Sequence, residues 1–583
     1  MKVFRKIVLL LICFIMSLSV VGCAGGGDGG SGGGTGGNTG GSTSDLPASC
    51  DISFANYSNV QACSDISAYE AGVVDNRAVP QGVIISPYYT MIINGETVPV
   101  YASRSANGIH SFAYIDVLDT EDEGFNLNVK ITVNSQTSVM RGSNPKVVVL
   151  PQSHGVEAVV NKETMTVSAV LSDYGSYSFV FNKKHKDPIT IMVAESIDKT
   201  ELFGNYEIEY ITPGDYATAT TNSQTIFTEE NTVYYFSAGY YKIDSIELPS
   251  NSILYTEIGA YLELFNVDTN KYALKVQGSE QNQLENVKVV GRGLIDYSSC
   301  NGSWLEGHGE YYTPQKSHLW FWWINNLEIS GMTVINSNTW TVYVESCKNV
   351  HVSNMFLIAY KTYADGIMLS NCIDSVVEKS FARTGDDAFE VKSRNASTRL
   401  TNNVIFQYCD AWTDKALAYG VVYECHNDTR NVIFRNCSVG FALGNWSSHL
   451  GCCVIQLGEQ ARPNRVNENI YFENIEIYQS FNKAILNCYV GGLPARKDDG
   501  SGHINNIYFK NITCETNYGK VLNVETYDTE DCSIGNIYID NVVSNKTKVT
   551  SANIEDLMIN AVKTSSGGLG GYDMSKLFID TRI

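Results

Sequence analysis

The feature that most constrains the fold is a short unit that recurs through the second part of the chain. Each copy begins with Asn or Asp, continues with a short strand rich in Val, Ile, Tyr and Phe, and reaches another strand after a small polar step. Copies begin 23 to 40 residues apart, at Asn286, Asn326, Asn349, Asp374, Asn403, Asn431, Asn469, Asn506 and Asn536. A short minimum period with insertions of variable length is typical of a parallel β-helix, where insertions leave the stacked coils as loops.

A helical repeat does not fit these units. They alternate with a period of two and are rich in β-branched and aromatic residues, which favours strands over helices. Six residues after several anchors stands a soft or apolar side chain, which predicts an inward row with its cysteines acting as core filler. The row consists of Met332, Met355, Cys409, Cys437, Ile475 and Ile512. We therefore predict an all-β chain whose residues 205–583 form a parallel β-helix.

A second folded region precedes the repeats. Residues 48–204 contain short alternating runs, for example 129–133, 177–181 and 189–193, with turn residues between them. This pattern predicts an antiparallel β-sandwich. The region contains no recognisable catalytic constellation, so the chemistry is expected in the β-helix.

The first residues have the composition of an export signal. Positive charges precede an apolar run at 7–21, which is short for a membrane span, so residues 1–22 are expected to be a signal peptide. The sequence Val20-Val21-Gly22-Cys23 resembles the lipobox of bacterial lipoproteins, which implies lipid attachment at Cys23. Residues 23–47, rich in Gly and Ser, predict a flexible tether. We expect an exported bacterial lipoprotein that its lipid holds at the outer membrane or cell surface.

The net charge of the protein bears on which kinds of partner it can bind. At a formal charge of -21 the surface repels phosphate backbones, and to a lesser degree polyanionic sugars, so no nucleic acid is expected. Neither a Cys cluster nor a Cys/His cluster has zinc spacing, and we predict no cofactor and no metal. We expect the protein to be a monomer.

Carboxylates coincide in neighbouring coils. Asp365 and Asp387 stand 22 residues apart, which is one bare coil, and Asp386 lies beside them. Stacked coils are about 4.8 Å apart, so these side chains should meet on the outer face. Acids gathered so closely cannot all ionise, and at least one should hold a proton near neutral pH. Such a pair can serve glycoside hydrolysis with inversion or with retention, depending on the separation of the carboxyls.

The stretch 336–393 resembles the core of the polygalacturonase-like β-helix hydrolases of glycoside hydrolase family 28. That family's Asn-Ser-Pro-x-Trp, Asn-Thr-Asp-Gly and Gly-Asp-Asp-x-x-x-x-Lys-Ser stand here at 336–340, 363–366 and 385–393. The resemblance implies a right-handed β-helix and an inverting mechanism. It also implies Asp386 as the general acid, with Asp365 and Asp387 holding the attacking water.

Several residues differ from the family 28 pattern, and these differences bear on whether the substrate carries a charge. Tyr363 replaces the family's Asn, and its Gly-His-Gly falls at 418–420. The Arg-x-Lys element that grips a uronate carboxylate falls near 453–456, where no basic residue stands. The related family 49, the dextranase and isopullulanase group, keeps the three Asp residues, lacks that element and carries an N-terminal β-sandwich. We prefer family 49, which implies a neutral α-glucan such as dextran or pullulan.

Several further residues are candidates for substrate contact. Trp340, by its family position, is the predicted sugar platform, because sugar faces stack on aromatic rings. Three of the four side chains at 320–323 are expected to pack in the core, because strand residues alternate faces. Lys392 can equally be a salt-bridge partner of the Asp cluster. The weaker candidates are Lys392, Tyr419, Glu424 and His426.

Rival functions remain open on the same fold. A polygalacturonase-like hydrolase would use the same three Asp residues. A polysaccharide lyase would place calcium on the carboxylates and use Arg or Lys as the base. A third alternative is a surface protein that binds glycans without cleaving them. The linkage and the choice between endo and exo action stay undetermined.

Overall fold

The computed structural model describes residues 50–580, except 72–81, 119–123, 135–139, 141–144, 216–224, 244–245, 265–273, 300–318, 338, 395–398, 445–450, 458–463, 492–500, 529–531 and 565–568. The signal peptide, the tether and Cys23 lie outside the described residues. The described residues belong to one compact unit, Ala48–Ile583. Within them no helix has both the length and the apolar character needed to cross a membrane.

The N-terminal region is a β-sandwich, as predicted. Its strands pair antiparallel, apart from a parallel pair between β6 and β12. One sheet contains β1 (Ile52–Phe54), β2 (Ile84–Ile85), β5 (Tyr101–Ser105), β6 (Gly108–Val117), β8 (Val147–Leu150), β11 (Gly175–Phe181) and β12 (Ile189–Glu195). The other contains β3 (Tyr89–Ile93), β4 (Glu96–Val98), β7 (Leu127–Val133), β9 (Val159–Asn161) and β10 (Thr166–Leu171). The alternation of β7 points Val129 and Ile131 into the core between the sheets, against Phe179 and Ile191.

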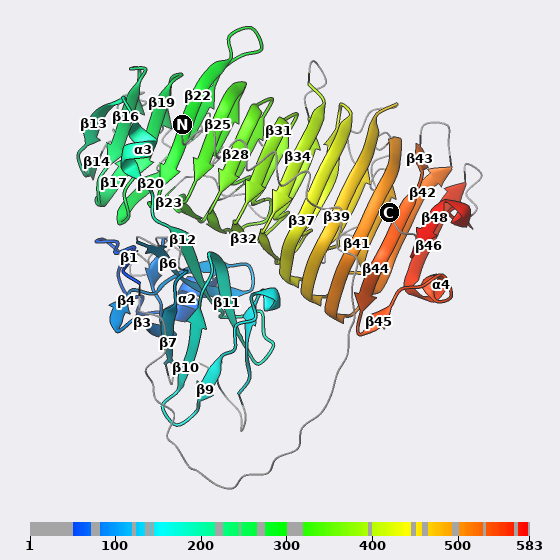
Figure 1. The fold of residues 1–583 in the computed structure, drawn as a ribbon, viewed down its shortest axis with the longest axis horizontal. Coiled ribbons are helices and arrows are strands. Elements are labelled where there is room, and N and C mark those ends of the chain that lie inside the picture. The colour runs from blue at the N-terminus through cyan, green and yellow to red at the C-terminus, as the bar shows by residue number, and fades with distance from the viewer. Residues whose placement is uncertain are drawn as a thin grey trace, which may run out of the picture. The chain divides into compact units, whose positions relative to one another are not determined.

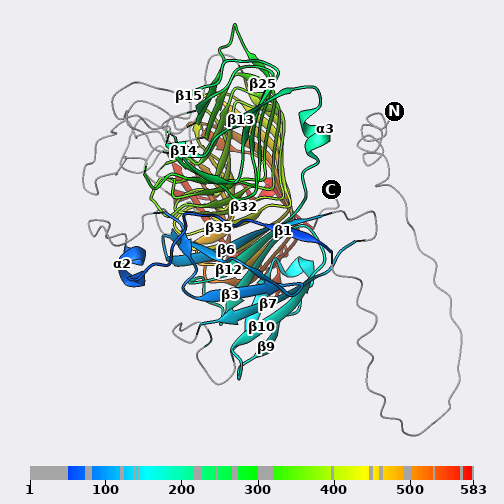
Figure 2. The same cartoon turned by 90° about the vertical axis from the view of Figure 1, so that its left-hand side faces the viewer.

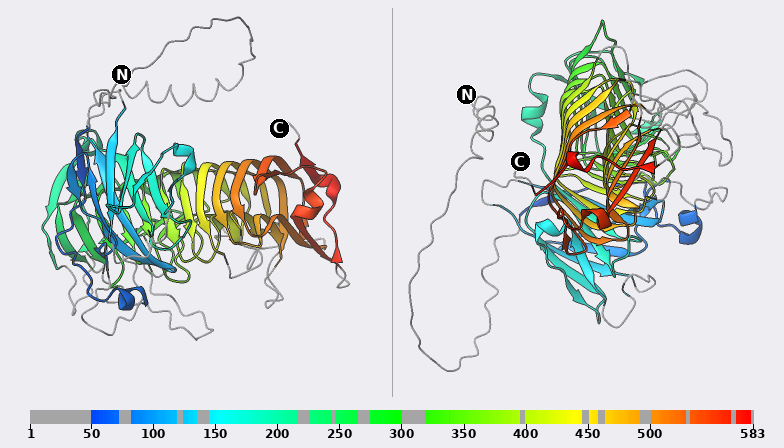
Figure 3. Two further views of the ribbon diagram at one scale, coloured as in Figure 1. Left: turned by 90° about the horizontal axis from the view of Figure 1, so that it is seen from below. Right: turned by 90° about the vertical axis from the view of Figure 1, so that its right-hand side faces the viewer.

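Residues from 207 onward form a right-handed parallel β-helix (Figure 1). Most coils give two strands to a 23-stranded sheet, here the long sheet, and one to a 13-stranded sheet, here the short sheet. In β37 (Thr429–Ala442), β39 (Val466–Ser480) and β41 (Gly502–Asn517) the two strands of the long sheet are joined into one. Figure 2 looks almost along the stack of coils, and Figure 3 shows the strands side by side.

The long sheet consists of β13 (Glu207–Ile211), β14 (Gly214–Asp215), β16 (Thr232–Phe236), β17 (Gly239–Ile243), β19 (Ser252–Thr256), β20 (Ala260–Leu264), β22 (Leu284–Gly291), β23 (Leu294–Asp296), β25 (Ile324–Ser330), β26 (Thr333–Ile335), β28 (Lys348–Ser353), β29 (Phe356–Ile358), β31 (Ile373–Glu378), β32 (Phe381–Thr384), β34 (Thr401–Gln407), β35 (Asp410–Thr413), β37 (Thr429–Ala442), β39 (Val466–Ser480), β41 (Gly502–Asn517), β43 (Cys532–Ile534), β44 (Ile537–Ser544), β45 (Thr547–Lys548) and β48 (Leu577–Ile579).

The short sheet consists of β15 (Thr225–Ile226), β18 (Ile246–Glu247), β21 (Leu274–Gln277), β24 (Leu319–Trp322), β27 (Val342–Glu345), β30 (Ile367–Ser370), β33 (Phe389–Ser393), β36 (Tyr419–Cys425), β38 (Cys453–Leu457), β40 (Ala484–Val490), β42 (Lys520–Asp528), β46 (Met558–Thr564) and β47 (Leu569–Gly570). The α-helices of the described residues are short: α2 (Ile66–Ala71), α3 (Lys199–Phe203) and α4 (Ile554–Leu557).

The anchor residues of the sequence repeat hold one corner of the solenoid. Asn286, Asn326 and Asn349 have φ values of 53°, 61° and 53°, in the left-handed region that Asn tolerates better than other side chains. The Nδ2 of Asn326 donates to the Oδ1 of Asn286 at 3.0 Å, and that of Asn349 donates to Asn326 at 3.1 Å. An amide carries both a donor and an acceptor, so the pairing continues from coil to coil. These two demands explain why the repeat begins with Asn.

The interior of the β-helix is apolar and continuous. All six members of the inward row lie in one buried cluster, which confirms the prediction for Met332, Cys409 and the rest. Phe406 and Phe434 stack at 5.1 Å in neighbouring coils, and Phe434 and Phe472 stack at 4.9 Å. The same inward position thus takes an aromatic side chain in successive coils.

The sandwich packs on the outer side of the second strand of several coils. Phe112 and Met192 of the sandwich share a buried cluster with Phe356, Phe381 and Trp412 of β29, β32 and β35. Two buried ion pairs accompany this apolar contact. Arg292 of the β-helix pairs with Asp116 of the sandwich, with 2.5 Å between Nε and Oδ1. Arg383 pairs with Asp414, and both residues belong to the β-helix.

Candidate active site

The turns before β30 and β33 bring two acids side by side. The backbone N–H of Gly366 donates to the carbonyl of Asp387 at 2.8 Å, so the two turns run as hydrogen-bonded neighbours. A Cβ at Gly366 would lie 2.2 Å from the carbonyl oxygen of Ala388, and one at Gly385 would lie 2.2 Å from that of Lys361. Both motif glycines are therefore required by the close stacking of turns.

The carboxyl groups gather as the sequence suggests, with one addition. Oxygen atoms of Asp365, Asp387 and Glu390 all lie within 4.8 Å of one another. Asp386 borders this group without belonging to it, and the side chains are nearly buried, with Asp365 and Asp387 each 3% exposed and Asp386 8% exposed. We call Asp365, Asp386, Asp387 and Glu390 the acid cluster.

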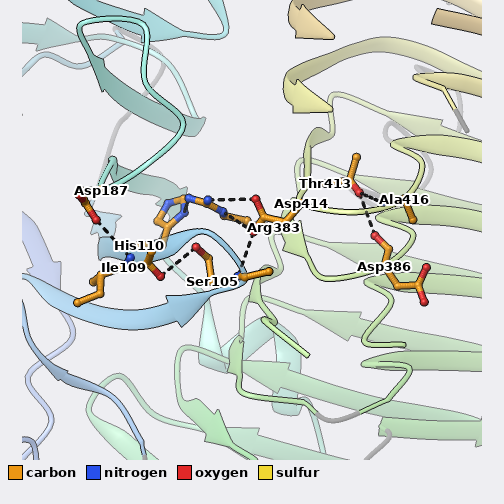
Figure 4. A network of polar contacts seen from close by, with 11 residues as sticks. Ser105, Ile109, His110, Asp187, Arg383, Asp386, Thr413, Asp414 and Ala416 are labelled. Atoms are coloured by element: carbon orange, nitrogen blue, oxygen red, sulfur yellow. Dashed lines mark hydrogen bonds and ion pairs between the residues drawn. The ribbon is translucent and has the colours of Figure 1, made fainter. Parts of the chain in front are cut away.

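Asp386 is held from both sides through its backbone. Its carbonyl accepts a hydrogen bond from the hydroxyl of Thr384 at 2.7 Å. It accepts another from the hydroxyl of Thr413 at 3.1 Å (Figure 4). Its carboxylate accepts backbone N–H bonds from Asp387 and from Tyr363. Tyr363 adopts a φ of 69°, so the residue that departs from the family pattern still serves the site through its backbone.

The sandwich reaches the segment that carries Asp386. Arg383 lies three residues before it and forms a two-point pair with Asp414, at 3.2 Å from Nε and 3.1 Å from Nη2 (Figure 4). Its Nη1 lies 3.3 Å from Nδ1 of His110 on β6, and the N–H of Ala106 donates to Asp414 at 3.2 Å. The sandwich thus supports the coil behind the acid cluster.

Lys392 supplies positive charge to the acid cluster. Its Nζ lies 3.2 Å from Glu390, 3.0 Å from Glu424 and 4.0 Å from Asp365. Glu424 also lies 3.9 Å from Nε of Arg394. Of the two roles left open for Lys392, the structure shows the ion-pair partner. The three oxygens of Asp365, Asp387 and Glu390 have metal-site spacing, but a metal ion there would meet repulsion from this ammonium group.

The surroundings raise the pKa values of the acids. Burial, followed by the charge of Glu390, raises the pKa of Asp365 and of Asp387 well above the usual range. The same two causes raise the pKa of Asp386 to about 7, although Lys392 and the backbone N–H donors oppose them. Asp386 can therefore hold a proton near neutral pH and release it, which is what a general acid requires.

Two of the weaker candidates lie outside the cluster. The prediction for Tyr419 is wrong: the side chain is fully buried inside the solenoid, and its hydroxyl donates to the carbonyls of Cys409 and Ser438, each at 2.7 Å. Strand pairing sets Tyr419 beside the inward Phe389, which leaves Gly420 on the outer face. Nδ1 of His426 lies 2.5 Å from the backbone carbonyl of Arg394.

An aromatic row lies on the outer face of the short sheet. Trp320 pairs in register with Tyr343, Tyr343 with Met368, and Met368 with Glu390. Trp322 stacks on Trp320 at 5.2 Å. Three of residues 320–323 are buried, as expected: Trp320, Phe321 and Trp323. Phe321 alone of these four enters the interior cluster, because alternate strand residues face opposite ways.

Trp340 joins this row. Its half-buried ring lies 5.1 Å from that of Tyr343, and the guanidinium carbon of Arg394 lies 4.3 Å from its centroid. The ring is thus beside the acid cluster and in contact with its cations. Its role as a sugar platform stays a prediction.

Glu390 is the residue that sequence reasoning missed. The alternation of apolar and charged residues in β33 could have revealed it. Phe389 and Val391 face inward, so Glu390 and Lys392 face the other acids. A strand that carries charge on the face of a suspected site is the pattern that could have revealed it.

Curated relatives match only part of the chain. "Probable exopolygalacturonase B" of Emericella nidulans is 28% identical over 301 residues, 49% of this chain and 55% of that protein. "Exopolygalacturonase B" of Aspergillus niger is 25% identical over 318 residues, 50% of this chain and 66% of that protein. The chain thus spans between about half and two thirds of the length of these relatives.

Among solved structures, "Dex49A from Penicillium minioluteum" matches with a TM-score of 0.60 at 13% identity, covering 91% of this chain and 99% of that one. At this identity the match establishes the fold alone. The model of the family described as glycosyl hydrolases family 28 matches residues 239–565, which include the acid cluster. Because that match covers more than half of the chain, the protein belongs to glycosyl hydrolases family 28.

Proposed function

We propose that this protein is an inverting glycoside hydrolase that cleaves a neutral polysaccharide, with an α-glucan such as dextran or pullulan as the first candidate. The observation that carries the proposal is the division of the acids. Asp386 has a pKa raised to about 7 and borders a compact group formed by Asp365, Asp387 and Glu390.

In this mechanism Asp386 gives its proton to the glycosidic oxygen as the bond from that oxygen to the anomeric carbon breaks. A water molecule held by Asp365 and Asp387 attacks the anomeric carbon from the opposite face. Its proton passes to the one of these two groups that is ionised in the reactive form, which is a strong base because its pKa is raised. The water must fit between acid and base, which is why inverting enzymes have widely separated carboxyls.

Charge favours an uncharged substrate. The carboxyls of the acid cluster and Glu424 outnumber the cations Lys392 and Arg394, and Glu424 already lies near both of these cations. On β38, where a uronate-binding Arg-x-Lys element would fall, Val454 lies outside the solenoid interior, and no residue of Cys453–Leu457 is basic. A uronate carboxylate would therefore meet net repulsion.

Aromatic rings support the same choice. Trp322 and Trp340 are half-buried on the sheet that carries the acid cluster, packed against the buried cluster that contains Trp320. A neutral pyranose offers an apolar face to such rings and hydroxyl groups to nearby carboxylates.

A polygalacturonase-like activity is the second candidate, because the curated relatives carry that name. We would incubate residues 45–583 and an Asp386→Asn variant with dextran, pullulan, polygalacturonate and galactans. Reducing sugar released from dextran or pullulan by the parent alone would support the proposal. Release from polygalacturonate alone would favour the second candidate.

The same assay separates the remaining alternatives. An unsaturated product that absorbs in the ultraviolet, with metal-dependent activity, would indicate a lyase. Binding without release of sugar would indicate a glycan-binding surface protein. NMR of the first-formed anomer tests inversion, since retention would place the second carboxyl in the role of nucleophile.

The proposal also covers where the protein is located in the cell. We propose that the lipid on Cys23 tethers the enzyme to the outer membrane or cell surface, on the basis of the sequence Val20-Val21-Gly22-Cys23. Incorporation of labelled palmitate into the wild type, and its loss in Cys23→Ser, would support this. Equal labelling of both proteins would contradict it.

A further inference from the structure

A cavity lies between the sandwich and the β-helix, at a different corner of the coils from the acid cluster. Its volume is about 640 Å³, within the range of small-ligand sites, and we call it the seam cleft. The sandwich lines it with residues that include His154 and Tyr174, and the β-helix with residues that include Tyr408 and Glu476. Tyr408 lies in the turn between β34 and β35, whereas Asp386 lies in the turn between β32 and β33. The seam cleft is thus separate from the candidate active site.

The turn that carries Tyr408 recurs in every neighbouring coil in a left-handed conformation. The register of the long sheet aligns these positions, and Asn occupies most of them. From Asn436 onward the amides form a ladder, in which Asn474 donates to Asn436 at 2.8 Å and Asn511 donates to Asn474 at 2.9 Å. The aligned residues are Asn354 (φ 54°), Lys379 (48°), Tyr408 (54°), Asn436 (53°), Asn474 (55°), Asn511 (53°) and Asn541 (50°).

Tyr408 and Lys379 depart from this rule where the seam cleft opens. A bulky side chain in the left-handed region carries a conformational cost that Asn largely avoids. The tyrosine also gives no amide to the ladder, and its side chain is 52% exposed, so packing does not explain its presence. Backbone strain that stability does not require tends to mark functional positions.

The chemistry of the seam cleft suits an uncharged, hydroxyl-rich ligand. Asp173, Asp410 and Glu476 line it together with Lys379, so acids exceed bases and an anion would be repelled. Within the described residues, the buried Nδ1 of His154 has no hydrogen-bond partner. Burial lowers the pKa of His154, which leaves the ring neutral and able to bond a hydroxyl group.

Two of the carboxylates that line the seam cleft, those of Glu476 and Asp410, are already engaged. Glu476 accepts backbone N–H bonds from Gln152 at 2.5 Å and Ser153 at 2.9 Å, and Asp410 accepts a bond from the hydroxyl of Ser438 at 2.5 Å and one from Ser176. The bonds from Gln152, Ser153 and Ser176 join the sandwich to the β-helix at the cavity. The walls are thus preorganised, while the ring of Tyr408 and the nitrogen of His154 are left for a ligand.

We propose that the seam cleft is a second, non-catalytic saccharide site that holds a short segment of neutral glycan against the ring of Tyr408. The ligand class rests on the proposed function, since a polysaccharide hydrolase meets such chains at high local concentration. The site would keep the polymer on the enzyme between cleavages, as multivalent attachment does.

The test uses Tyr408→Asn in an Asp386→Asn background, because Asn is the residue that the same turn carries in other coils. Isothermal titration with isomaltotriose and with maltotriose is expected to show a binding event that weakens about tenfold or more in the double variant. The melting temperature of the double variant should equal or exceed that of Asp386→Asn alone. The reason is that Asn suits the left-handed turn and adds an amide to the ladder.

Tyr210→Asn is the matched control, since Tyr210 is 68% exposed on β13 and does not line the seam cleft. It should leave binding unchanged. Trigalacturonate is the charged comparator and should not bind at the seam cleft. Equal affinity of Asp386→Asn with and without Tyr408→Asn, no binding of either neutral trisaccharide, or binding of trigalacturonate alone would each overturn the inference.

Hydrolysis by the wild type separates this inference from the proposed function. Cleavage of a glucan without any binding that depends on Tyr408 would overturn the saccharide site alone. Binding that depends on Tyr408, without cleavage of any glycan in the panel, would overturn the proposed hydrolase and leave the saccharide site standing.

Discussion

Two buried groups of charges on neighbouring coils are built in opposite ways. Beside the packed face of the sandwich, Arg383 and Asp414 have side chains 0% and 3% exposed, and each finds a two-point partner of opposite charge. At the acid cluster, Lys392 and Asp365 are 5% and 4% exposed, but several carboxylates share one ammonium group. Matched charges hold the fold together, whereas unmatched ones raise pKa values and create acid–base chemistry.

The largest effect should follow from removing the acid. Asp386→Asn deletes the proposed proton donor, and general acid catalysis contributes about 10²- to 10⁴-fold. We expect kcat/KM on the cleaved glycan to fall by that factor. A variant that melts as a folded protein and still releases sugar at the parental rate would remove the assignment.

Breaking the matched pair should cost stability. Arg383→Met leaves Asp414 buried without its partner, and such changes cost about 3–5 kcal/mol in the free energy of unfolding. Chemical denaturation measures this, and Arg383→Met with Asp414→Leu should recover most of the loss. The control is Lys183→Met, which breaks an exposed pair with Glu515 at 3.0 Å and should cost less than about 1 kcal/mol. Equal losses in both single variants would refute the contrast.

The unmatched group should make stability depend on pH. The pKa of Asp386 is about 7 in the folded protein and near 3.8 when unperturbed, so between these values the folded state holds a proton that the unfolded state has lost. Wild-type stability should therefore fall as pH rises from about 4 to 7. Asp386→Asn should avoid the part of this loss that belongs to Asp386 and be more stable at pH 8, by up to about 4 kcal/mol at about 1.4 kcal/mol per pKa unit. Asp365 and Asp387, whose pKa values are also raised, should keep their own part of the loss in both proteins.

Thermal melts of both proteins at pH 4 and pH 8 check this prediction. The advantage of Asp386→Asn should shrink to less than about 1 kcal/mol at pH 4, because there the folded carboxyl is protonated and the unfolded one, with a pKa near 3.8, is still protonated in a large fraction of molecules. A gap of the same size at both pH values would show that the substitution acts through packing instead of charge.

The smallest effect tests the residue that sequence reasoning missed. Glu390→Gln removes a negative charge that raises the pKa values of Asp365, Asp386 and Asp387, so these pKa values should fall. Both limbs of the kcat/KM profile should move to lower pH by about one unit. Glu390→Asp should keep most of the wild-type profile. Glu378→Gln, at a carboxylate that pairs with His351 at 3.0 Å, should not move it.

Particular residues show which features of the fold and the site could be predicted from the sequence. The Asn anchors predicted the coils correctly, because the left-handed turn and the amide ladder impose the same residue type in each coil. The spacing of Asp365 and Asp387 by one coil predicted their proximity for the same reason. The prediction that Tyr419 contacts substrate is wrong because Tyr419 pairs with the inward-facing Phe389. The outward position beside it is taken by Gly420. The predicted burial of three of residues 320–323 is correct, but Trp320 packs in a cluster outside the solenoid interior.

The sequence by itself determined the solenoid, its apolar interior and the meeting of two aspartates, since these depend on period and on residue type within one or two coils. The tertiary structure alone decided which charges have partners. Arg383 meets His110 across 273 positions, and Lys392 meets Glu424 only after a full coil has closed. Burial and long-range docking set these contacts, and neither is encoded in a local pattern.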